Sequence, residues 1–415
     1  MTIKIRPQAL VRASGGPRYA VALVVDALGT GLLRPFLLLY GVTVLGLSAS
    51  ATGIAMTAGV VAGLGCVPAV GRWLDRGARS TAVAASMLVR VLGVALLLAT
   101  PAGHAGLFAT AALFLGIGNQ AWPAAHAALV ATVAHGRDRD AALAGGRALR
   151  NAGLGAGGLL ATACLAGGAT ALHALAVVTG LAYLVAAALA WSVRLRARPA
   201  ATPAEDDGPA PRLRTLLAAN VVYVFCLNVP EIALPLVLVT QLHASPVWPA
   251  AIFVANTVLV VTLQVPVTVL MARFARRTAL ALGGVVLAAS YAGFLAATSW
   301  GAPAVAVVSV VCTFGEIIYA GSATALVTAV APAHVLGRAL ARFQLSTGFG
   351  LAVSPAVITA LASRGPAVLW GSLAAATLAS ASAVAKEKEP PASSLSTVAG
   401  YPGGLLGDFL RKTKH

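Results

Sequence analysis

Charged residues are scarce in this sequence. Only 10% of its 415 residues are Asp, Glu, Lys or Arg, whereas 59% are hydrophobic. A soluble domain has about 25% charged residues, so a water-soluble fold is excluded. Aromatic residues are also few, at 6%, and the 43 glycines suit closely packed membrane helices better than barrel strands. The composition therefore predicts an all-α integral membrane protein.

Acidic residues are the scarcer of the two kinds of charge. The sequence has 12 Asp and Glu against 29 Lys and Arg, which gives a net charge of +17. In a soluble protein this excess would indicate nucleic-acid binding. Here the basic residues stand in short runs between apolar stretches, which is the pattern of loops at a membrane surface. We therefore expect a lipid bilayer as partner and no nucleic acid.

The sequence lacks the motifs of several kinds of catalytic and nucleotide-binding site. There is no GxSxG, HExxH or phosphate-binding GxxxxGK[ST], and no nucleophile, base and orienting group stand out together. The four cysteines, Cys66, Cys164, Cys226 and Cys312, lie in apolar stretches without metal-ligand spacing, so we expect small core residues. The sequence thus predicts no enzyme, no metal site and no cofactor. Without a nucleotide site, the energy source must be an ion gradient or the gradient of the substrate.

Twelve apolar stretches have the length of about 20 residues that a helix needs to cross a bilayer. They lie at 19–43, 51–71, 80–100, 106–134, 148–166, 170–193, 215–240, 247–271, 278–297, 302–331, 343–363 and 366–385. The polar, proline-rich segment between the sixth and seventh is typical of a flexible connector. We expect an N-terminal segment 1–18, a bundle 19–193, a linker 194–214, a second bundle 215–385 and a mostly disordered tail 386–415.

Nearly all basic residues fall on one side of these spans. The N-terminal segment, the loops after spans two, four, eight and ten, the linker and the tail hold 26 of the 29, with Arg150 at the edge of span five counted in the loop before it. By the positive-inside rule these segments face the cytoplasm, and so do both termini. The preference for 24 Arg over 5 Lys beside abundant Ala and Gly indicates a GC-rich bacterial genome. We therefore expect a multi-pass protein of the bacterial cytoplasmic membrane.

The two halves of the chain resemble each other. A shift of 197 residues places Gly118 on Gly315, and a shift of 195 places Arg147 on Arg342. Matches that recur at nearly one offset are expected of two copies of a six-helix unit.

The loop after span two carries a recognisable pattern. It reads GRWLDRGARS from Gly71 to Ser80 and resembles the loop signature of the major facilitator superfamily. Gly71, Asp75, Arg76 and Arg79 match that signature, whereas its second glycine and its last basic residue are replaced.

The resemblance implies two pseudo-symmetric six-helix bundles and secondary transport by alternating access. A degenerate echo of the motif at 272–278 fits the repeat, and the stretch 315–339 is similar to span ten of the drug/proton antiporter branch. That branch implies export of a drug or natural product against protons. Two features depart from it: span four has no basic residue, and the span-five signature is reduced to NAGLGAGG at 151–158, without its proline.

The resemblance also implies that the loop motif, grouped with Arg147 and Arg342, controls opening and closing. An acid such as Asp75 at a membrane edge can accept hydrogen bonds from a neighbouring helix N-terminus and pair with arginine. It would then latch the two halves on the cytoplasmic side. The alternative is that Asp75, Arg76 and Arg79 only fix topology and fold.

Three acids lie well inside spans: Asp26, Glu231 and Glu316. A charge near a helix centre costs about 3 kcal/mol on insertion scales, so each acid is a candidate for function. Burial favours the neutral form of a carboxylic acid, which can then carry a proton, the expected coupling ion. We favour Glu316, which has Tyr319 one turn away, then Asp26. Glu231 is either a further carrier or a contact for a cationic substrate.

Two arginines, Arg34 and Arg90, also lie inside spans and are candidates for the substrate cavity. Permanent cations there favour anionic or zwitterionic substrates over lipophilic cations. Alternatively, these arginines form structural ion pairs with Asp26 or Glu231.

Polar and aromatic residues supply further candidates for the cavity: Asn119, Gln120, Trp122, His126, Asn228 and Tyr319. Interhelical hydrogen bonding is an equally good interpretation of the strip in span four. A single residue such as His126 is more often a satisfied interior side chain than a proton relay or a metal ligand.

These observations predict a monomeric twelve-helix transporter with a midplane cavity for a small hydrophobic or amphipathic molecule. Proton-coupled export is the leading function, and proton symport or facilitated diffusion of a small organic solute is the alternative. A receptor-like relative that no longer transports is a third interpretation. The retained loop motif and the insertion cost of three buried acids argue against it.

Overall fold

The computed structural model describes residues 11–164, 167–193, 213–245 and 247–387. Within these ranges the regular elements are all helical, which confirms the predicted all-α membrane fold. The predicted linker and most of the predicted tail lie outside the described residues.

The N-terminal half forms six helical rods. The first consists of α2 (Pro17–Leu33), the 3₁₀ turn η1 (Arg34–Phe36) and α3 (Leu37–Thr43). Pro35 has no backbone N–H for the α-helical ladder, which explains the turn at this point. The other rods are α4 (Ala49–Asp75), α5 (Arg79–Leu98), α6 (Ala105–Val133), α7 (Gly136–Cys164) and α8 (Gly168–Ser192).

The C-terminal half repeats this order. Its first rod is irregular and consists of α9 (Arg214–Tyr223), η3 (Val224–Asn228), η4 (Val229–Ala233), α10 (Leu234–Leu236) and η5 (Val237–Gln241), of which η4 and η5 are π-helical. The other rods are α11 (Val247–Met271), α12 (Arg276–Ala297) with the turn η6 (Thr298–Trp300), α13 (Ala302–Val330), α14 (Leu336–Ala362) and α15 (Pro366–Lys386).

Ten of the rods in the described ranges are long and apolar enough to cross a membrane. The remaining two, α6 and α7, have 29 residues each but are interrupted by polar side chains. Both of these helices line the central cavity described below.

Two rods begin earlier than the sequence predicts. Helix α7 begins at Gly136 rather than at residue 148, and α14 begins at Leu336 rather than at residue 343. The prediction treated arginines as loop residues. However, arginine is among the better helix formers, and its long stem lets the guanidinium reach polar surroundings. Arg147 therefore lies inside α7 and not in a loop.

Apolar side chains cover the outside of the bundles as well as their interior. Ile54 and Leu159 are 70% and 73% exposed, as expected of side chains that face lipid. Cys226 and Cys312 are buried as predicted, whereas Cys164 is exposed at the end of α7. The prediction for Cys164 was wrong because an apolar stretch in a membrane helix has a lipid-facing side as well as a core side.

Glycines bring the helices of each bundle into close contact. A Cβ at Gly63 of α4 would lie 2.7 Å from the Gly116 carbonyl carbon of α6 and 3.0 Å from Gln120 Cγ. At the crossing of α2 and α7, a Cβ at Gly31 would lie 2.9 Å from Leu154 Cα. Lipid gives no hydrophobic drive to helix association, so close packing of this kind supplies much of it.

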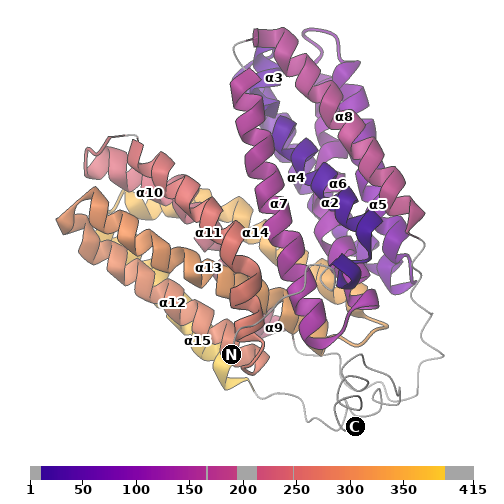
Figure 1. The fold of residues 1–415 in the computed structure, drawn as a ribbon. Helices are drawn as coiled ribbons and strands as arrows, with labels where there is room; N and C mark the ends of the chain where they lie inside the picture. The colour runs from indigo at the N-terminus through magenta and orange to yellow at the C-terminus, as the bar shows by residue number, and fades with distance from the viewer. Residues whose placement is uncertain (1–10, 165–166, 194–212, 246, 388–415) are drawn as a thin grey trace, which may run out of the picture.

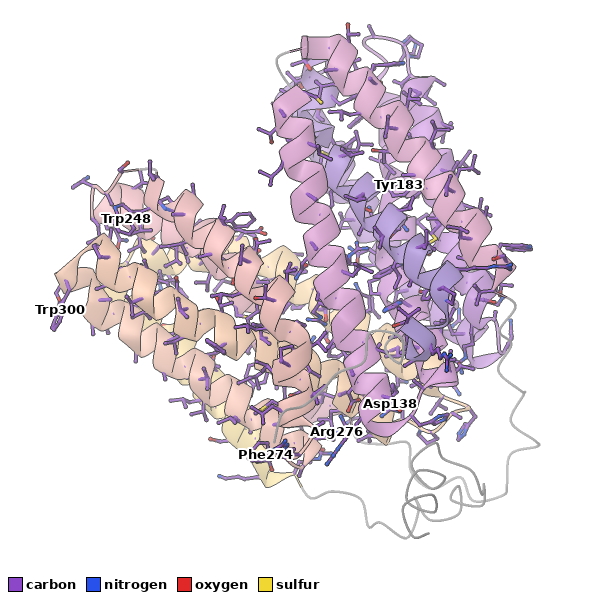
Figure 2. All side chains as sticks on the ribbon, in the orientation of Figure 1. Asp138, Tyr183, Trp248, Phe274, Arg276 and Trp300 are labelled. Carbon is purple, nitrogen blue, oxygen red and sulfur yellow. The ribbon has the colours of Figure 1, made fainter. Side chains whose placement is uncertain are left out.

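The two bundles meet at one end and diverge toward the other (Figure 1). They contact each other mainly through α4 with α14 and through α7 with α11. Figure 2 shows Asp138 and Arg276 where the bundles meet, and Trp248 and Trp300 at the opposite end of the C-terminal bundle. We call the first of these the joined end and the second the far end.

The substitution Gly63→Ala is expected to lower the free energy of unfolding by about 1–3 kcal/mol, because the added methyl group overlaps the backbone of α6. Gly65→Ala is the matched control: Gly65 is on the same helix, and nothing lies within 4 Å of an added Cβ there. Both substitutions raise helix propensity equally. Thermal unfolding in detergent measures the difference, and equal melting temperatures would contradict the packing.

Candidate functional site

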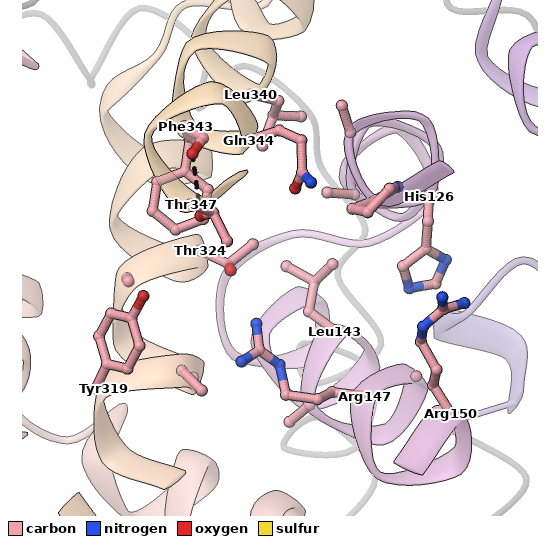
Figure 3. A pocket seen from close by; sticks show the side chains of 18 of the residues that line it. His126, Leu143, Arg147, Arg150, Tyr319, Thr324, Leu340, Phe343, Gln344 and Thr347 are labelled. Carbon is pink, nitrogen blue, oxygen red and sulfur yellow. Dashed lines mark hydrogen bonds between the residues drawn. The ribbon is translucent and has the colours of Figure 1, made fainter. Parts of the chain in front are cut away.

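A cavity of about 300 Å³ lies between the two bundles. Helices α6 and α7 form one wall and α13 and α14 the other (Figure 3). The polar and aromatic residues that line it are Trp122, His126, Arg147, Arg150, Asn151, Glu316, Tyr319, Thr324, Gln344 and Thr347, and the larger apolar ones are Leu143, Leu227, Leu340 and Phe343. Its size and mixed lining suit a small amphipathic molecule.

Arg150 lies where α7 faces α6. Its guanidinium carbon is 4.4 Å from the ring centre of Trp122, and Trp122 stacks on His126 with ring centroids 4.9 Å apart. His126 Nδ1 in turn shares a 2.8 Å hydrogen bond with the Tyr19 hydroxyl. The aromatic face attracts the cation. Trp122 and His126 therefore line the cavity and also position an arginine that the sequence analysis did not place there.

Arg147 lies one turn earlier on α7. The sequence groups it with the gating motif, but the structure places it on the cavity wall, where it extends toward Tyr319 and Thr324 of α13 (Figure 3). The early start of α7 explains the difference, because it moves Arg147 from a loop into the span.

Glu316 of α13 stands between two cavities. One is the central cavity, and the other is a chamber of about 10 Å³ whose polar lining is Asn256, Ser309 and Thr313, with room for roughly one water molecule. Glu316 is 9% exposed and its carboxylate interacts with the Asn256 side chain. Thr313 donates a 2.7 Å hydrogen bond to Asn256 Oδ1, which leaves the amide N–H groups for the acid. Glu316 is thus a buried acid with polar space on two sides.

Tyr319 lies one turn beyond Glu316. Its hydroxyl donates a 2.7 Å hydrogen bond to Asn220 Oδ1 of α9. The Asn220 amide then donates to Ser346 Oγ and Thr347 Oγ1 of α14, at 2.8 and 2.9 Å. This network joins three helices and fixes the Tyr319 ring on the cavity wall.

Asp26 is sealed inside the N-terminal bundle. It is 1% exposed, and its Oδ1 lies 2.5 Å from Nη2 of Arg90, which is 0% exposed. Its Oδ2 lies 3.5 Å from Nη1 of Arg150. Arg90 also stands over the Tyr183 ring, 4.4 Å from its centre. This is the internal ion pairing that the sequence analysis gave as the alternative for Asp26, and Arg90 is not among the residues that line the described cavity.

Arg34 and Glu231 lie outside the lining of the described cavity. Arg34 in η1 and Glu231 in η4 are exposed, one on each bundle, and the 197-residue shift relates them. They lie within electrostatic range of each other, although no ion pair joins these two described residues.

Three polar candidates make contacts between helices or lie away from the cavity. Gln120 Oε1 accepts a 3.0 Å hydrogen bond from Gln344 Nε2 of the opposite bundle. Asn228 donates a hydrogen bond to Ser354 of α14. Asn119 is not among the lining residues, and its buried Oδ1 has no hydrogen-bond partner in the described part of the chain. Gln120 thus follows the interpretation of interhelical bonding that was given for span four. Asn228, predicted only as a cavity residue, also bonds between helices and is not among the lining residues.

Asp75, the last residue of α4, contacts the first turn of α14 across the joined end. Its Oδ1 accepts a 2.6 Å hydrogen bond from the Gly337 backbone N–H, and its Oδ2 lies 2.7 Å from Arg338 Nε. A carboxylate at a helix N-terminus satisfies free N–H groups and complements the helix dipole. One bundle therefore caps a helix of the other.

A second contact of this kind lies at the start of α7. Asp140, 2% exposed, forms an ion pair with Arg276 at the start of α12. Next to it, Arg139 donates a 2.9 Å hydrogen bond to the Thr328 carbonyl of α13. The loop after the second rod of each half thus contacts the first turns of the fifth rod of the other half.

The remaining motif residues differ in their surroundings. A Cβ at Gly71 would come within 3.0 Å of the Gly337 carbonyl oxygen, so glycine is needed where α4 and α14 touch. Arg79 is buried at the start of α5. Arg76 and Arg342 are exposed and make no ion pair with any described residue. Arg342 therefore takes no part in the ion pair between Asp75 and α14.

Four residues at the joined end were not predicted from the sequence: Gly337, Arg338, Asp140 and Arg276. A signal for them exists in the repeat, because the 197-residue shift places Asp140 on Gly337. Asp75 contacts the start of the helix that contains Gly337. The same shift therefore places Asp140 at the equivalent position, at the start of the corresponding helix in the other half.

Two six-helix bundles around a central cavity define a membrane transport protein. In the described ranges, no group of three His, Cys, Asp or Glu side chains is placed to hold a metal ion. The family model described as Major Facilitator Superfamily matches residues 19–229 and 216–412. The chain therefore belongs to the major facilitator superfamily, whose members are secondary transporters and not enzymes.

Several solved structures share this fold at low sequence identity. The human organic anion transporter MFSD10 is 14% identical with a TM-score of 0.69, over 92% of this chain and 100% of that one. The E. coli fucose:proton symporter FucP is 13% identical with a TM-score of 0.70, over 90% and 98%. A bacterial homologue of the iron transporter ferroportin in the outward-facing state is 11% identical with a TM-score of 0.71, over 89% and 98%. No curated protein matches the sequence significantly.

The substitution Asp26→Asn is expected to lower the free energy of unfolding by about 3–5 kcal/mol, because it leaves Arg90 buried without a counter-charge. Adding Arg90→Met removes that cation and should restore most of the loss. Thermal unfolding of the purified proteins in detergent measures both effects. An Asp26→Asn protein as stable as the wild type would show that the ion pair does not stabilise the bundle.

Proposed function

We propose that the chain is a proton-coupled secondary transporter that moves a small amphipathic molecule through the central cavity, with Glu316 as the proton-binding residue. The position of Glu316 carries this proposal, because among the acids in the described ranges it alone lines the cavity. Asp26 is held by two arginines, and Glu231 is exposed away from the cavity lining.

The surroundings of Glu316 suit a residue that binds and releases a proton. Glu316 is 9% exposed and lines the same cavity as Arg147. Loss of water generally favours the neutral form of a carboxylic acid, whereas a nearby positive charge favours the ionised form. Movement of the bundles changes hydration and the distance to Arg147, and so changes the balance of these two influences. A proton affinity that differs between two conformations couples proton movement to the conformational change.

The conformation follows from the positive-inside rule. Asp138 and Arg276 lie at the joined end (Figure 2), and Arg72, Arg137 and Arg273 lie within three residues of Asp75, Asp138 and Arg276 along the chain. The rule assigns this end to the cytoplasm. On this assignment the structure is closed to the cytoplasm and faces outward. Alternating access then requires that the contacts of Asp75 and Asp140 break when the cavity opens inward.

The substitution Asp75→Asn is expected to shift the population toward the inward-facing state, because it removes the ion pair with Arg338. Spin labels at Ser50 and Ser299, on the two bundles at the far end, report this shift as a larger share of short distances in double electron–electron resonance. Asp138→Asn is the matched control, because Asp138 is exposed at the joined end and has no ion pair with a described residue. Identical distance distributions for the two variants would contradict a latch at Asp75.

The substitution Glu316→Gln is expected to abolish proton flux driven by substrate, because an amide cannot take up and release the proton. Liposomes that contain the purified protein and a pH-sensitive dye are exposed to a panel of anionic, cationic and neutral amphipathic compounds. Glu231→Gln is the matched control and should retain the flux. Retained flux in Glu316→Gln would contradict the proposed site. If no compound of the panel drives proton flux through the wild-type protein, the facilitator or the receptor-like alternative is favoured.

The sense of the coupling distinguishes two candidate functions. Export against protons requires that substrate and proton compete, whereas symport requires that each favours binding of the other. The resemblance of residues 315–339 to the drug/proton antiporter branch supports export. The arginines on the opposite wall, Arg147 and Arg150, support symport.

A further inference from the structure

Arg147 is a cation on the cavity wall without a direct counter-ion. It makes no hydrogen bond or ion pair with any described residue, and it extends into the space between α7 and α13 (Figure 3). A guanidinium in the middle of a membrane-spanning helix is costly unless something pairs with it, and arginine does not release its proton. An anion in the cavity would supply the missing partner.

The neighbouring charges do not balance Arg147. Arg90 and Arg150 share a single carboxylate, that of Asp26, so those three groups keep one net positive charge. Glu316 interacts electrostatically with Arg147 across the cavity but forms no ion pair with it. These five groups therefore carry one net positive charge when Glu316 is ionised and two when it is protonated.

We infer that the cavity binds an amphipathic organic anion, with its charged group between Arg147 and Arg150, and that the anion moves together with a proton. This inference rests on the proposed proton site and adds the class of substrate. Guanidinium groups bind carboxylate and sulfonate oxygens through paired, directional hydrogen bonds. Asn151 and Thr324 add an amide and a hydroxyl donor to the cavity lining.

The apolar part of such a molecule has its own place in the cavity. Leu143 extends from α7 between the two arginines and the wall of α14, and Leu340 and Phe343 complete that wall (Figure 3). A cavity of about 300 Å³ accommodates a molecule of about the size of a substituted aromatic acid. The lining thus selects one negative charge on an apolar body.

Proton and anion favour each other in this geometry. While Glu316 is ionised, it offsets the charge of Arg147. An anion at Arg147 takes over that role, and Glu316 is then free to bind a proton. By reciprocity, a proton on Glu316 strengthens binding of the anion. Joint loading is the condition for co-transport and not for exchange.

Other groups around Glu316 do not supply this coupling. The titratable groups that face it are Glu231 of η4, Cys226 of η3, Tyr291 of α12, and Cys312 and Tyr319 of its own helix. His126 of α6 lines the cavity from the other bundle. Because histidine is the side chain that ordinarily gains charge between about pH 8 and pH 5, the test must separate His126 from Glu316.

The charge of the cavity can be measured with reagents of opposite charge. The full-length protein, with its four native cysteines replaced, carries Thr324→Cys on the cavity wall. It reacts either with the anionic sulfonatoethyl or with the cationic trimethylammonioethyl methanethiosulfonate, and the ratio of the two rates cancels the intrinsic reactivity of the thiol. Ser299→Cys at the far end is the matched control. We expect the ratio to favour the anionic reagent by about tenfold or more relative to this control, and to rise on acidification.

Three further variants identify the residues that cause the preference for the anionic reagent and its dependence on pH. Arg147→Gln should remove most of the preference, and Arg147→Lys, which keeps the charge, should retain it. Glu316→Gln should hold the preference at its acidic level at every pH. Equal rates, a preference for the cation, or no effect of Arg147→Gln would overturn the anion site. A pH dependence that survives Glu316→Gln would assign it to another group such as His126 and overturn the joint loading.

The proposed function and this inference fail separately. Proton flux in liposomes tests Glu316 irrespective of the charge of the substrate. Flux that depends on Glu316 together with a cavity that prefers cations would leave the transporter proposal standing and exclude the anion.

Discussion

A charge held away from water inside a bilayer needs a partner, and the ion pair of Asp26 with Arg90 meets this need inside the N-terminal bundle. Arg150 is held between the same carboxylate and the face of Trp122. Of the charges that these contacts leave unpaired, Arg147 and Glu316 both line the central cavity and form no ion pair with each other. The fold thus separates the buried ion pair inside the N-terminal bundle from the charged residues that line the cavity.

At the joined end the two halves of the internal repeat make equivalent contacts through side chains of opposite charge. In one half the loop after the second rod supplies an acid, Asp75, to the first turn of α14. In the other half the equivalent loop supplies a base, Arg276, to Asp140 of α7. The repeat conserves the position of the contact but not its chemistry. A degenerate motif such as ARFARRT can therefore serve the same purpose as the recognisable one.

Composition and hydropathy were enough to predict the all-α membrane fold, the order of the helical rods and most of their bounds. The role of Asp75 as a partner for a helix N-terminus also followed from its chemistry. The start of α7 could not be predicted from the sequence, because local hydropathy does not distinguish an arginine that faces a cavity from an arginine in a loop. For the same reason Arg147 and Arg150 were not placed in the cavity. The choice of Arg90 as the partner of Asp26 depends on how α2 and α5 pack, which no local pattern contains.

The sign of the charge that each bundle presents to the other reverses between the joined end and the cavity. At the joined end the N-terminal bundle presents the acids Asp75 and Asp140 to arginines of the C-terminal bundle. In the cavity it presents arginines to Glu316. If one bundle slid along the other by a few helical turns, like charges would come face to face at a large electrostatic penalty. This alternation of charge therefore permits the two bundles to tilt about their contact, and it opposes sliding of one bundle past the other along the membrane normal.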